Sequence, residues 1–444
     1  MDHLLKAKMQ KLIDMSLAAG ADKADVILSA GDSFSLSAQN NKIDKYQVSG
    51  SQVLGLRVIK DQKIGLAYSE ALDEDALKSI SEAAVENAKN SEVNPHEDIR
   101  LENGEKTFES EYKQVDTDVD EKINFCLSLE ADVLKKEPKA KAAPYNGLGE
   151  GTSSSYYMNH LGTFTYESDY YMSCYTSALI QDGANSSMHF HDSMGRKLSD
   201  LKKDECVNES IEHAKEWLTA KSLSTGKYDV IFTPDAFSQV FGCFSNIYSA
   251  KGAMEKTNPF ADRLGQKVMS ELITIKDIPQ YQDGFFKSFV DSEGVLQEDL
   301  DLVVDGVMKN FYHNSSTAHY FNTETNGRAA RGAKSSLGTS GTTKVISAGK
   351  TNVTDLKSGE YFKIHSLQGL HSGANAISGE FSFAASGYLM KDGKRVRPVK
   401  GVTVSSNFHK MLTSINLIGD KIESTTNKGF FSPLMRFENI SIAG

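Results

Sequence analysis

Cysteine and proline are scarce in this chain, and long apolar runs are missing. Among 444 residues there are four cysteines and eight prolines. The cysteines stand far apart without Cys-x-x-Cys spacing, which argues against a disulfide framework and against a zinc knuckle. No apolar stretch reaches the roughly 18 positions that a membrane-spanning helix needs. We therefore expect a chain that does not cross a membrane, and we expect it in the cytoplasm.

Positive charge is also in deficit. The 49 Lys and Arg residues face 59 Asp and Glu residues, which gives a net charge of −10. Nucleic-acid binding needs Lys and Arg side chains to neutralise the backbone phosphates, and an excess of acidic residues works against this. Direct nucleic-acid binding is therefore not expected. Residues 1–20 place apolar side chains at helical spacing between lysines, where a secretory signal would need an unbroken apolar stretch. They predict a helix that ends at Gly20 rather than a signal peptide.

A metal-binding signature is missing as well, although the chain has 11 histidines. The only His-Glu pair is His96 and Glu97. A zinc-peptidase helix would need a second histidine at position 100 or 101, and these positions hold Arg100 and Leu101. A phosphate-binding loop and a Gly-x-Ser-x-Gly nucleophile elbow are absent too. No single motif in the sequence therefore defines a hydrolase or a nucleotide site.

The N-terminal half, residues 1–225, shows the same order of elements twice, which divides it into units 1–110 and 111–225. In the first unit we expect strands at 24–28, 33–38, 43–49, 51–60 and 63–69, with turns at Gly31-Asp32, Asn40-Asn41 and Ser49-Gly50. In the second, which starts near Asp116, we expect strands at 153–158, 163–168, 170–181 and 185–192. The pattern predicts two helix-flanked antiparallel sheets joined by a polar surface linker at 91–115.

Whether the two units arose by internal duplication is left open by the sequence. Residues 40–43 resemble residues 159–162, yet any two α+β stretches look alike at this level.

The C-terminal half, residues 226–444, reads as a β-rich domain after one helical segment. A buried strand is expected at 227–232 and a helix at 236–251. Strands are expected at 284–290, 301–310, 365–370, 379–390, 395–403 and 432–442, with a short helix at 407–415. Asp392-Gly393 between two alternating runs predicts a tight hairpin. The fold class is therefore α+β, and this domain is expected to be mostly antiparallel and curled or barrel-like.

Few histidines stand out as candidate ligands. His189 and His191 lie two positions apart on a predicted strand, so they share a face and could bind a metal together with Asp192. A polar strand end explains them equally well. Glu209 and His213 lie four positions apart on a predicted helix, and we expect both on its solvent-exposed face. His371 lies in a loop with three glycines at 368–379, where a backbone can approach a ligand closely and an imidazole can act as acid, base or ligand.

An ordered series of short motifs runs along nearly the whole chain. The N-terminal half contains Ala-Gly-Ala-Asp-Lys-Ala-Asp-Val at 19–26 and Gly-Leu-Arg-Val at 55–58. The C-terminal half contains Asp-Ser-Glu-Gly at 291–294, Thr-Asn-Gly-Arg at 325–328, Gly-Glu-Phe-Ser at 379–382 and Ala-Ser-Gly at 385–387. Each motif is short, but the series in this order resembles the TldD/PmbA family, and specifically its TldE (PmbA) branch.

The resemblance implies a subunit of a cytoplasmic metallopeptidase. In that family a TldD-type subunit carries HExxxH and its metal, and it pairs with a TldE-type subunit to cleave peptides. At the corresponding place this chain reads Phe-Gly-Cys-Phe-Ser-Asn-Ile-Tyr at 241–248, so no ligand position transfers. The resemblance therefore implies a non-catalytic subunit that binds no metal or cofactor itself. The expected partners are a TldD-like subunit, or a second copy of this chain, and an extended peptide.

A peptide- or partner-facing surface is expected at the loop that contains Gly369, His371, Asn375 and Gly379. Two other functions are kept as alternatives. The first is a self-sufficient homodimeric hydrolase that uses a divergent site, either His189, His191 and Asp192 or His371. The second is a regulatory protein-binding module, in keeping with the family's label as a modulator of DNA gyrase.

Overall fold

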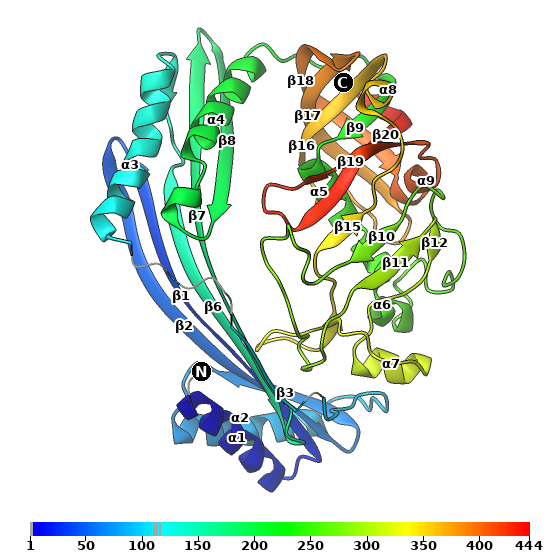
Figure 1. Cartoon of the computed structure of the whole chain (residues 1–444). Helices are drawn as coiled ribbons and strands as arrows, with labels where there is room; N and C mark the ends of the chain where they lie inside the picture. Colours follow the sequence, from blue (N-terminus) through cyan, green and yellow to red (C-terminus); the bar gives the residue numbers. More distant parts are fainter. Residues whose placement is uncertain (1–2, 103, 110–113, 115–116) are drawn as a thin grey trace.

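The computed structural model describes residues 3–102, 104–109, 114 and 117–444. Two sheets dominate it, and they stand side by side in Figure 1. Sheet A belongs to the N-terminal half and sheet B to the C-terminal half. This arrangement confirms the predicted α+β fold class. In the described part of the chain, no helix is both long enough and apolar enough to span a membrane.

Sheet A joins the strands of both predicted units into one sheet. Its described strands run in the order β3-β2-β1-β6-β7-β4, with β5 and β8 also paired to β7. The two units meet where β1 pairs antiparallel with β6, so the expectation of two separate sheets is wrong. The bounds are β1 Lys23–Gln39, β2 Lys42–Lys60, β3 Lys63–Ser69, β4 Glu105–Glu109, β5 Ala140–Ala142, β6 Gly147–Asn159, β7 Phe164–Asp182 and β8 Asn185–Gly195.

The strands of sheet A are longer than predicted because two expected turns are absent. Gly31 pairs with Ser51, and Asp32 with Gly50, inside the continuous β1–β2 ladder. A Cβ on Gly31 would lie only 2.4 Å from the Thr152 carbonyl oxygen of β6. Glycine is thus required for close strand approach here and not for chain reversal. The predicted turn at Asn40 and Asn41 is confirmed, with φ values of 54° and 56°.

Four helices cover the two ends of sheet A, as Figure 1 shows. At one end, α1 (His3–Ala18) and α2 (Glu74–Lys89) pack on β1 to β3 around a core that includes Leu12, Val26 and Leu56. Asp73 caps α2 by accepting the Ala76 N–H. At the other end, α3 (Val119–Lys136) and α4 (Lys203–Trp217) pack on β6 to β8. A short 3₁₀ turn, Leu198–Asp200, precedes α4.

The stretch predicted as a polar surface linker is partly built into the fold. Within residues 91–115, Ile99 is buried and β4 pairs parallel with the start of β7. The predicted boundary between residues 110 and 111 and the predicted start at Asp116 lie outside the described residues. Internal duplication and the unit boundaries stay predictions.

Sheet B closes on itself, in agreement with the expected curled or barrel-like domain. β9, β16, β17, β18 and β20 pair in a circuit, because β9 binds both β16 and β20. The β17–β18 hairpin turns at Asp392 and Gly393 as predicted, with φ values of 49° and 76°. The circuit consists of β9 Gly226–Phe232, β16 Glu360–Gln368, β17 Glu380–Lys391, β18 Lys394–Asn407 and β20 Phe430–Ala443.

Shorter elements extend sheet B or cover it. Further strands are β10 Ile275–Asp277, β11 Leu300–Val304, β12 Val307–Met308, β15 Lys344–Ile346 and β19 Leu417–Ser424. β13 Ala329–Ala330 and β14 Gly338–Thr339 form a separate pair. Small helices are α7 Ser315–Phe321, α8 Val353–Leu356 and α9 Phe408–Thr413, the last of which lies within the expected 407–415.

Three predictions for the C-terminal half are wrong. The single strand expected at 301–310 is a hairpin, since β11 pairs antiparallel with β12 around a turn at Asp305 and Gly306. The helix expected at 236–251 is three short pieces: α5 Pro234–Cys243, a 3₁₀ turn at Ser245–Tyr248 and α6 Ala250–Met254. The strand expected at 284–290 does not form. Its last two N–H groups, of Phe289 and Val290, instead donate to the Glu167 carboxylate on β7. That segment therefore ties the two halves together.

We predict that Gly31→Ala destabilises the protein, because its Cβ would press on backbone that cannot rotate away. Overpacking of this kind costs about 1–3 kcal/mol, which thermal unfolding would register as a lower midpoint. Gly242→Ala is the matched control, since a Cβ added at Gly242 of α5 would meet nothing within 4 Å. Equal midpoints for the two variants would contradict this account of β1 and β6.

Candidate functional site

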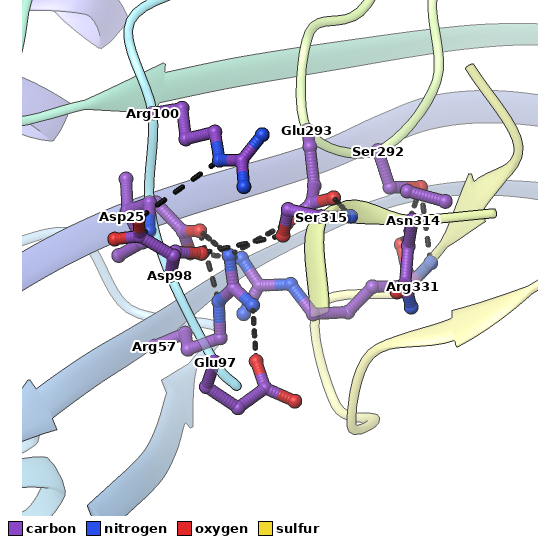
Figure 2. A network of polar contacts seen from close by, with 12 residues as sticks. Asp25, Arg57, Glu97, Asp98, Arg100, Ser292, Glu293, Asn314, Ser315 and Arg331 are labelled. Atoms are coloured by element: carbon purple, nitrogen blue, oxygen red, sulfur yellow. Dashed lines mark hydrogen bonds and ion pairs between the residues drawn. The ribbon is translucent and has the colours of Figure 1, made fainter. Parts of the chain in front are cut away.

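A buried network of charges holds the two halves of the chain together (Figure 2). Asp25 and Arg57 are cross-strand partners on β1 and β2, and both are almost completely buried, at 0% and 1% exposed. The Arg57 Nε donates to Asp25 Oδ2 at 2.9 Å. Arg57 also donates to Glu97 at 3.1 Å. The N-terminal half thus contributes one cation and two carboxylates to the network, with Asp25 and Arg57 from sheet A and Glu97 from the segment after α2.

The C-terminal half completes the network with Glu293 and Arg331. Glu293 accepts from Arg57 Nη2 at 3.2 Å, and Arg331 Nη2 donates to Asp25 Oδ1 at 2.6 Å. The second Glu293 oxygen accepts the Ser315 N–H at the start of α7. Burial alone would lower the pKa of Arg57, but Asp25, Glu293 and Glu97 raise it well above its ordinary value. Every charged group here is thus paired, as buried charges must be.

Three of the short motifs from the sequence meet at this network. Asp25 lies in residues 19–26, Arg57 in 55–58 and Glu293 in 291–294. Gly55 lets the chain of the C-terminal half approach β2, because a Cβ there would lie 2.0 Å from the Ala333 carbonyl oxygen. These motifs therefore build a contact between the two halves.

A cavity of about 540 Å³ adjoins the network, with walls from both sheet A and the C-terminal half. Two carboxyl groups line it, those of Glu167 and Asp291. Burial raises the pKa of Asp291 to about 7 and also raises that of Glu167. Backbone N–H groups of Glu293, Val295 and Ala329 donate to Asp291. With these donors engaged, Asp291 holds loops in place, and most of the residues around it in the cavity wall are polar.

Residues 241–248, where the family resemblance led us to look for metal ligands, form the end of α5 and the 3₁₀ turn after it. Phe241 and Phe244 point into the main core of the C-terminal half. Cys243 is half-buried, and burial raises its pKa, which disfavours the thiolate that a metal needs. Residues 241–248 thus bury their aromatic side chains in the core, and their polar side chains are only those of Cys243, Ser245, Asn246 and Tyr248, without a histidine or carboxylate to bind a cation.

The glycine-rich loop at residues 368–379 packs against the end of α5. Leu370 packs against the core, and its carbonyl oxygen lies 4.0 Å from Cys243 Sγ. Asn375 accepts the N–H groups of Ile377 and Ser378, so its side chain closes a turn. His371 is exposed.

The loop's terminal glycines have backbone roles. Gly369 and Gly379 both adopt positive φ, 80° and 79°, and a Cβ on Gly379 would press on the His409 ring at 2.7 Å. That the loop faces a peptide or partner stays a prediction.

The two histidines predicted to share a face of β8 have different further neighbours, although His191 is close enough to His189 to help lower its pKa. His191 and Asp192 line one cavity, of about 670 Å³, between β8 and residues 282–285 and 424–428. His189 instead faces His213 of α4 and His365 of β16. The prediction of a solvated face for His213 is wrong, because His213 is 3% exposed. Only the packing of α4 and β8 against sheet B brings His365 there, and no local pattern indicates it.

Comparisons with known proteins agree with this architecture. Three models of PmbA/TldA metallopeptidase domains match in order: domain 1 at 24–88, the central domain at 112–216 and the C-terminal domain at 225–444. A metalloprotease PmbA homolog from Haemophilus influenzae is 24% identical, with 96% of this chain and 94% of that protein covered.

Solved structures show the same fold over the whole chain. A Thermotoga maritima protein named as a modulator of DNA gyrase has a TM-score of 0.84 at 23% identity and covers 99% of this chain and all of its own. TldE from Thermococcus kodakarensis has a TM-score of 0.82 at 20% identity, with 98% and 100% covered. The chain has the architecture of a metallopeptidase-family protein. It belongs to the PmbA/TldD family.

We predict that Arg57→Met destabilises the protein strongly, because Asp25, Glu97 and Glu293 would stay buried with one cation fewer. Removing one partner of a buried ion pair costs about 3–5 kcal/mol, measurable as a fall in the unfolding midpoint. Lys139→Met removes an exposed partner of Asp182 and is expected to change the midpoint little. If both variants unfold at the same point, the network does not hold the halves together.

Proposed function

We propose that this chain is a TldE/PmbA-type subunit that supplies no catalytic metal and pairs with a TldD-like subunit carrying HExxxH. The observation that supports this is the packing of residues 241–248. Phe241 and Phe244 belong to the core there, so replacing them by metal ligands would also break the packing around them. The metal and its activated water would then come from the partner.

The chain's own contribution is to shape an enclosed chamber and to bind extended peptides. Extended peptides add to unpaired strand edges. Among the described strands of sheet B, β19 pairs only with β20 and the two-residue β12 pairs only with β11, so each leaves one edge free. A longer edge is β8, which pairs on one side with β7. Met188 and Phe190 of β8 are exposed at 42% and 45%, and they offer apolar contacts beside that edge.

In this proposal the TldD-like subunit docks on the loop of residues 369–379. It rests against α5 through Leu370, so a subunit docked on it would bring its own groups close to this helix. Ile377 at the tip is 62% exposed, and a solvated isoleucine there favours an interface. The four cysteines are free, which fits a reducing compartment such as the cytoplasm.

The test is a peptide-cleavage assay on the chain alone, on a TldD-like subunit from the same host alone, and on the two mixed. We expect the chain alone to leave an unstructured peptide intact. The mixture should cleave it, and a chelator or Glu→Gln in the partner's HExxxH should abolish cleavage. Chelator-sensitive cleavage by the chain alone would make it a self-sufficient hydrolase. A stable complex without cleavage would favour a regulatory binding protein.

We further predict that Ile377→Ser weakens association with the TldD-like subunit by about tenfold, since that ratio corresponds to roughly 1.4 kcal/mol. Size-exclusion chromatography and calorimetric titration of the two subunits would measure it. Val93→Ser, which changes an equally exposed residue (58%) outside the loop, is the control. Unchanged affinity in Ile377→Ser would remove the loop from the interface.

A further inference from the structure

Three histidines from distant parts of the sequence converge where α4 meets sheet B. His189 is on β8, His213 on α4 and His365 on β16. One ring nitrogen of each lies within 4.8 Å of those of the other two. Figure 1 shows α4 and β8 on the side of sheet A that is nearest to β16 and β18. The cluster therefore bridges the two halves of the chain, at the end opposite the Asp25–Arg57 network.

Two of these imidazoles lack hydrogen-bond partners. Within the described part of the chain, no hydrogen bond reaches the rings of His189 or His365. Neither ring has a described donor that occupies its nitrogens, so each can offer one nitrogen to the common centre. A neutral imidazole is the form that ligates metal ions.

The contacts of the third histidine orient it in the same way. The Tyr388 hydroxyl donates its only proton to Glu216 Oε2 at 2.5 Å. Tyr388 must therefore accept from His213 Nδ1–H, with which it is in contact. The other nitrogen, Nε2, then faces the Glu209 carboxylate oxygen at 3.2 Å. With Nδ1 protonated, the lone pair of His213 Nε2 and the Glu209 carboxylate oxygen are two acceptors that face each other. Such a contact is favourable only when a proton or a metal ion is bound there.

A further unpartnered group points to a ligand at this place. Among the described residues, the buried Trp217 Nε1 has no hydrogen-bond acceptor. Its ring lies 4.9 Å from that of His189, centre to centre. A water or anion on an open metal position would give this donor an acceptor. Metal-bound histidines commonly pass their second N–H to an outer oxygen, which here is the Tyr388 hydroxyl.

We propose that His189, His213 and His365 bind one divalent cation of the zinc class, with a water as the fourth ligand. A tetrahedral zinc at about 2.0–2.1 Å from each nitrogen needs ligand atoms about 3.4 Å apart. The three ring nitrogens lie within 4.8 Å of one another. On binding the ion they would therefore move roughly an ångström closer together. The ion would fasten α4 and β8 to β16. This site is separate from residues 241–248 and from the metal assigned to the partner, and it does not depend on the proposed function.

The test titrates the chelator-treated full-length chain with Zn²⁺ by calorimetry and with Co²⁺ by visible absorption. We expect one ion per chain, a tetrahedral Co²⁺ spectrum and a higher melting temperature with Zn²⁺. His189→Gln and His365→Gln should each weaken Zn²⁺ binding at least tenfold. His371→Gln, which changes an exposed histidine, is the control and should bind as the parent does.

Melting of the metal-free variants separates a lost ligand from a lost fold. His365→Gln without metal should melt close to the metal-free parent, and added Zn²⁺ should no longer raise its melting temperature. The proposal is overturned if the parent binds no Zn²⁺, or if both variants bind it as tightly as the parent does. In either case a proton would bridge His213 and Glu209.

These measurements also stand apart from the peptidase question, since they need neither peptide nor partner. If the chain alone bound Zn²⁺ and also cleaved peptide, with both properties lost in His365→Gln, the metal site would hold. The assignment of a non-catalytic subunit would then fail.

Discussion

The pairing of Arg57 with Asp25 and Glu293 is the constraint on which the rest of the structure depends. A guanidinium that is almost fully buried cannot be left without carboxylates, because its desolvation would cost several kcal/mol. Asp25 comes from the neighbouring strand, but Glu293 comes from the other half of the chain. The two halves must therefore dock in one register before Arg57 is satisfied. Glycine at position 55 makes that docking possible by removing the side chain that would meet the backbone at Ala333.

A second contact between the halves lies at the opposite end of sheet A and has a different chemistry. There Arg395 of β18 reaches Glu212 and Glu216 of α4, both at 2.8 Å, and Tyr388 joins His213 to Glu216. The charged groups of the first contact are all paired, but the buried His96 Nδ1 beside Glu97 has no hydrogen-bond partner among the described groups, and at the second contact the Trp217 Nε1 has none. Unmet hydrogen-bonding capacity of this kind is where a ligand can add stability. The polar cavity lined by Glu167 and Asp291 lies beside the first contact.

Local chemistry predicted some elements well and others poorly. The hairpin at Asp392 and Gly393 follows from positive φ values that few residues accept, and the closed β domain follows from its alternating strands. Gly31 and Gly50 looked equally like turns, yet they lie inside long strands, because only the approach of β6 shows why a side chain is excluded at Gly31. The segment 284–290 has a strand pattern, but its last N–H groups are taken by Glu167. His213 has helical spacing to Glu209, which does not reveal that sheet B covers that face.

The sequence by itself determined the fold class, the family resemblance and the absence of HExxxH, since each of these is carried by residue types in order along the chain. Only the tertiary structure decided what those residues do. Three of the short motifs proved to be parts of one buried charge network, because Asp25 and Arg57 pair across two strands and Glu293 reaches them only after the halves dock. His189, His213 and His365 meet for the same reason. Contacts between residues far apart in sequence depend on strand register and docking, which local spacing does not encode.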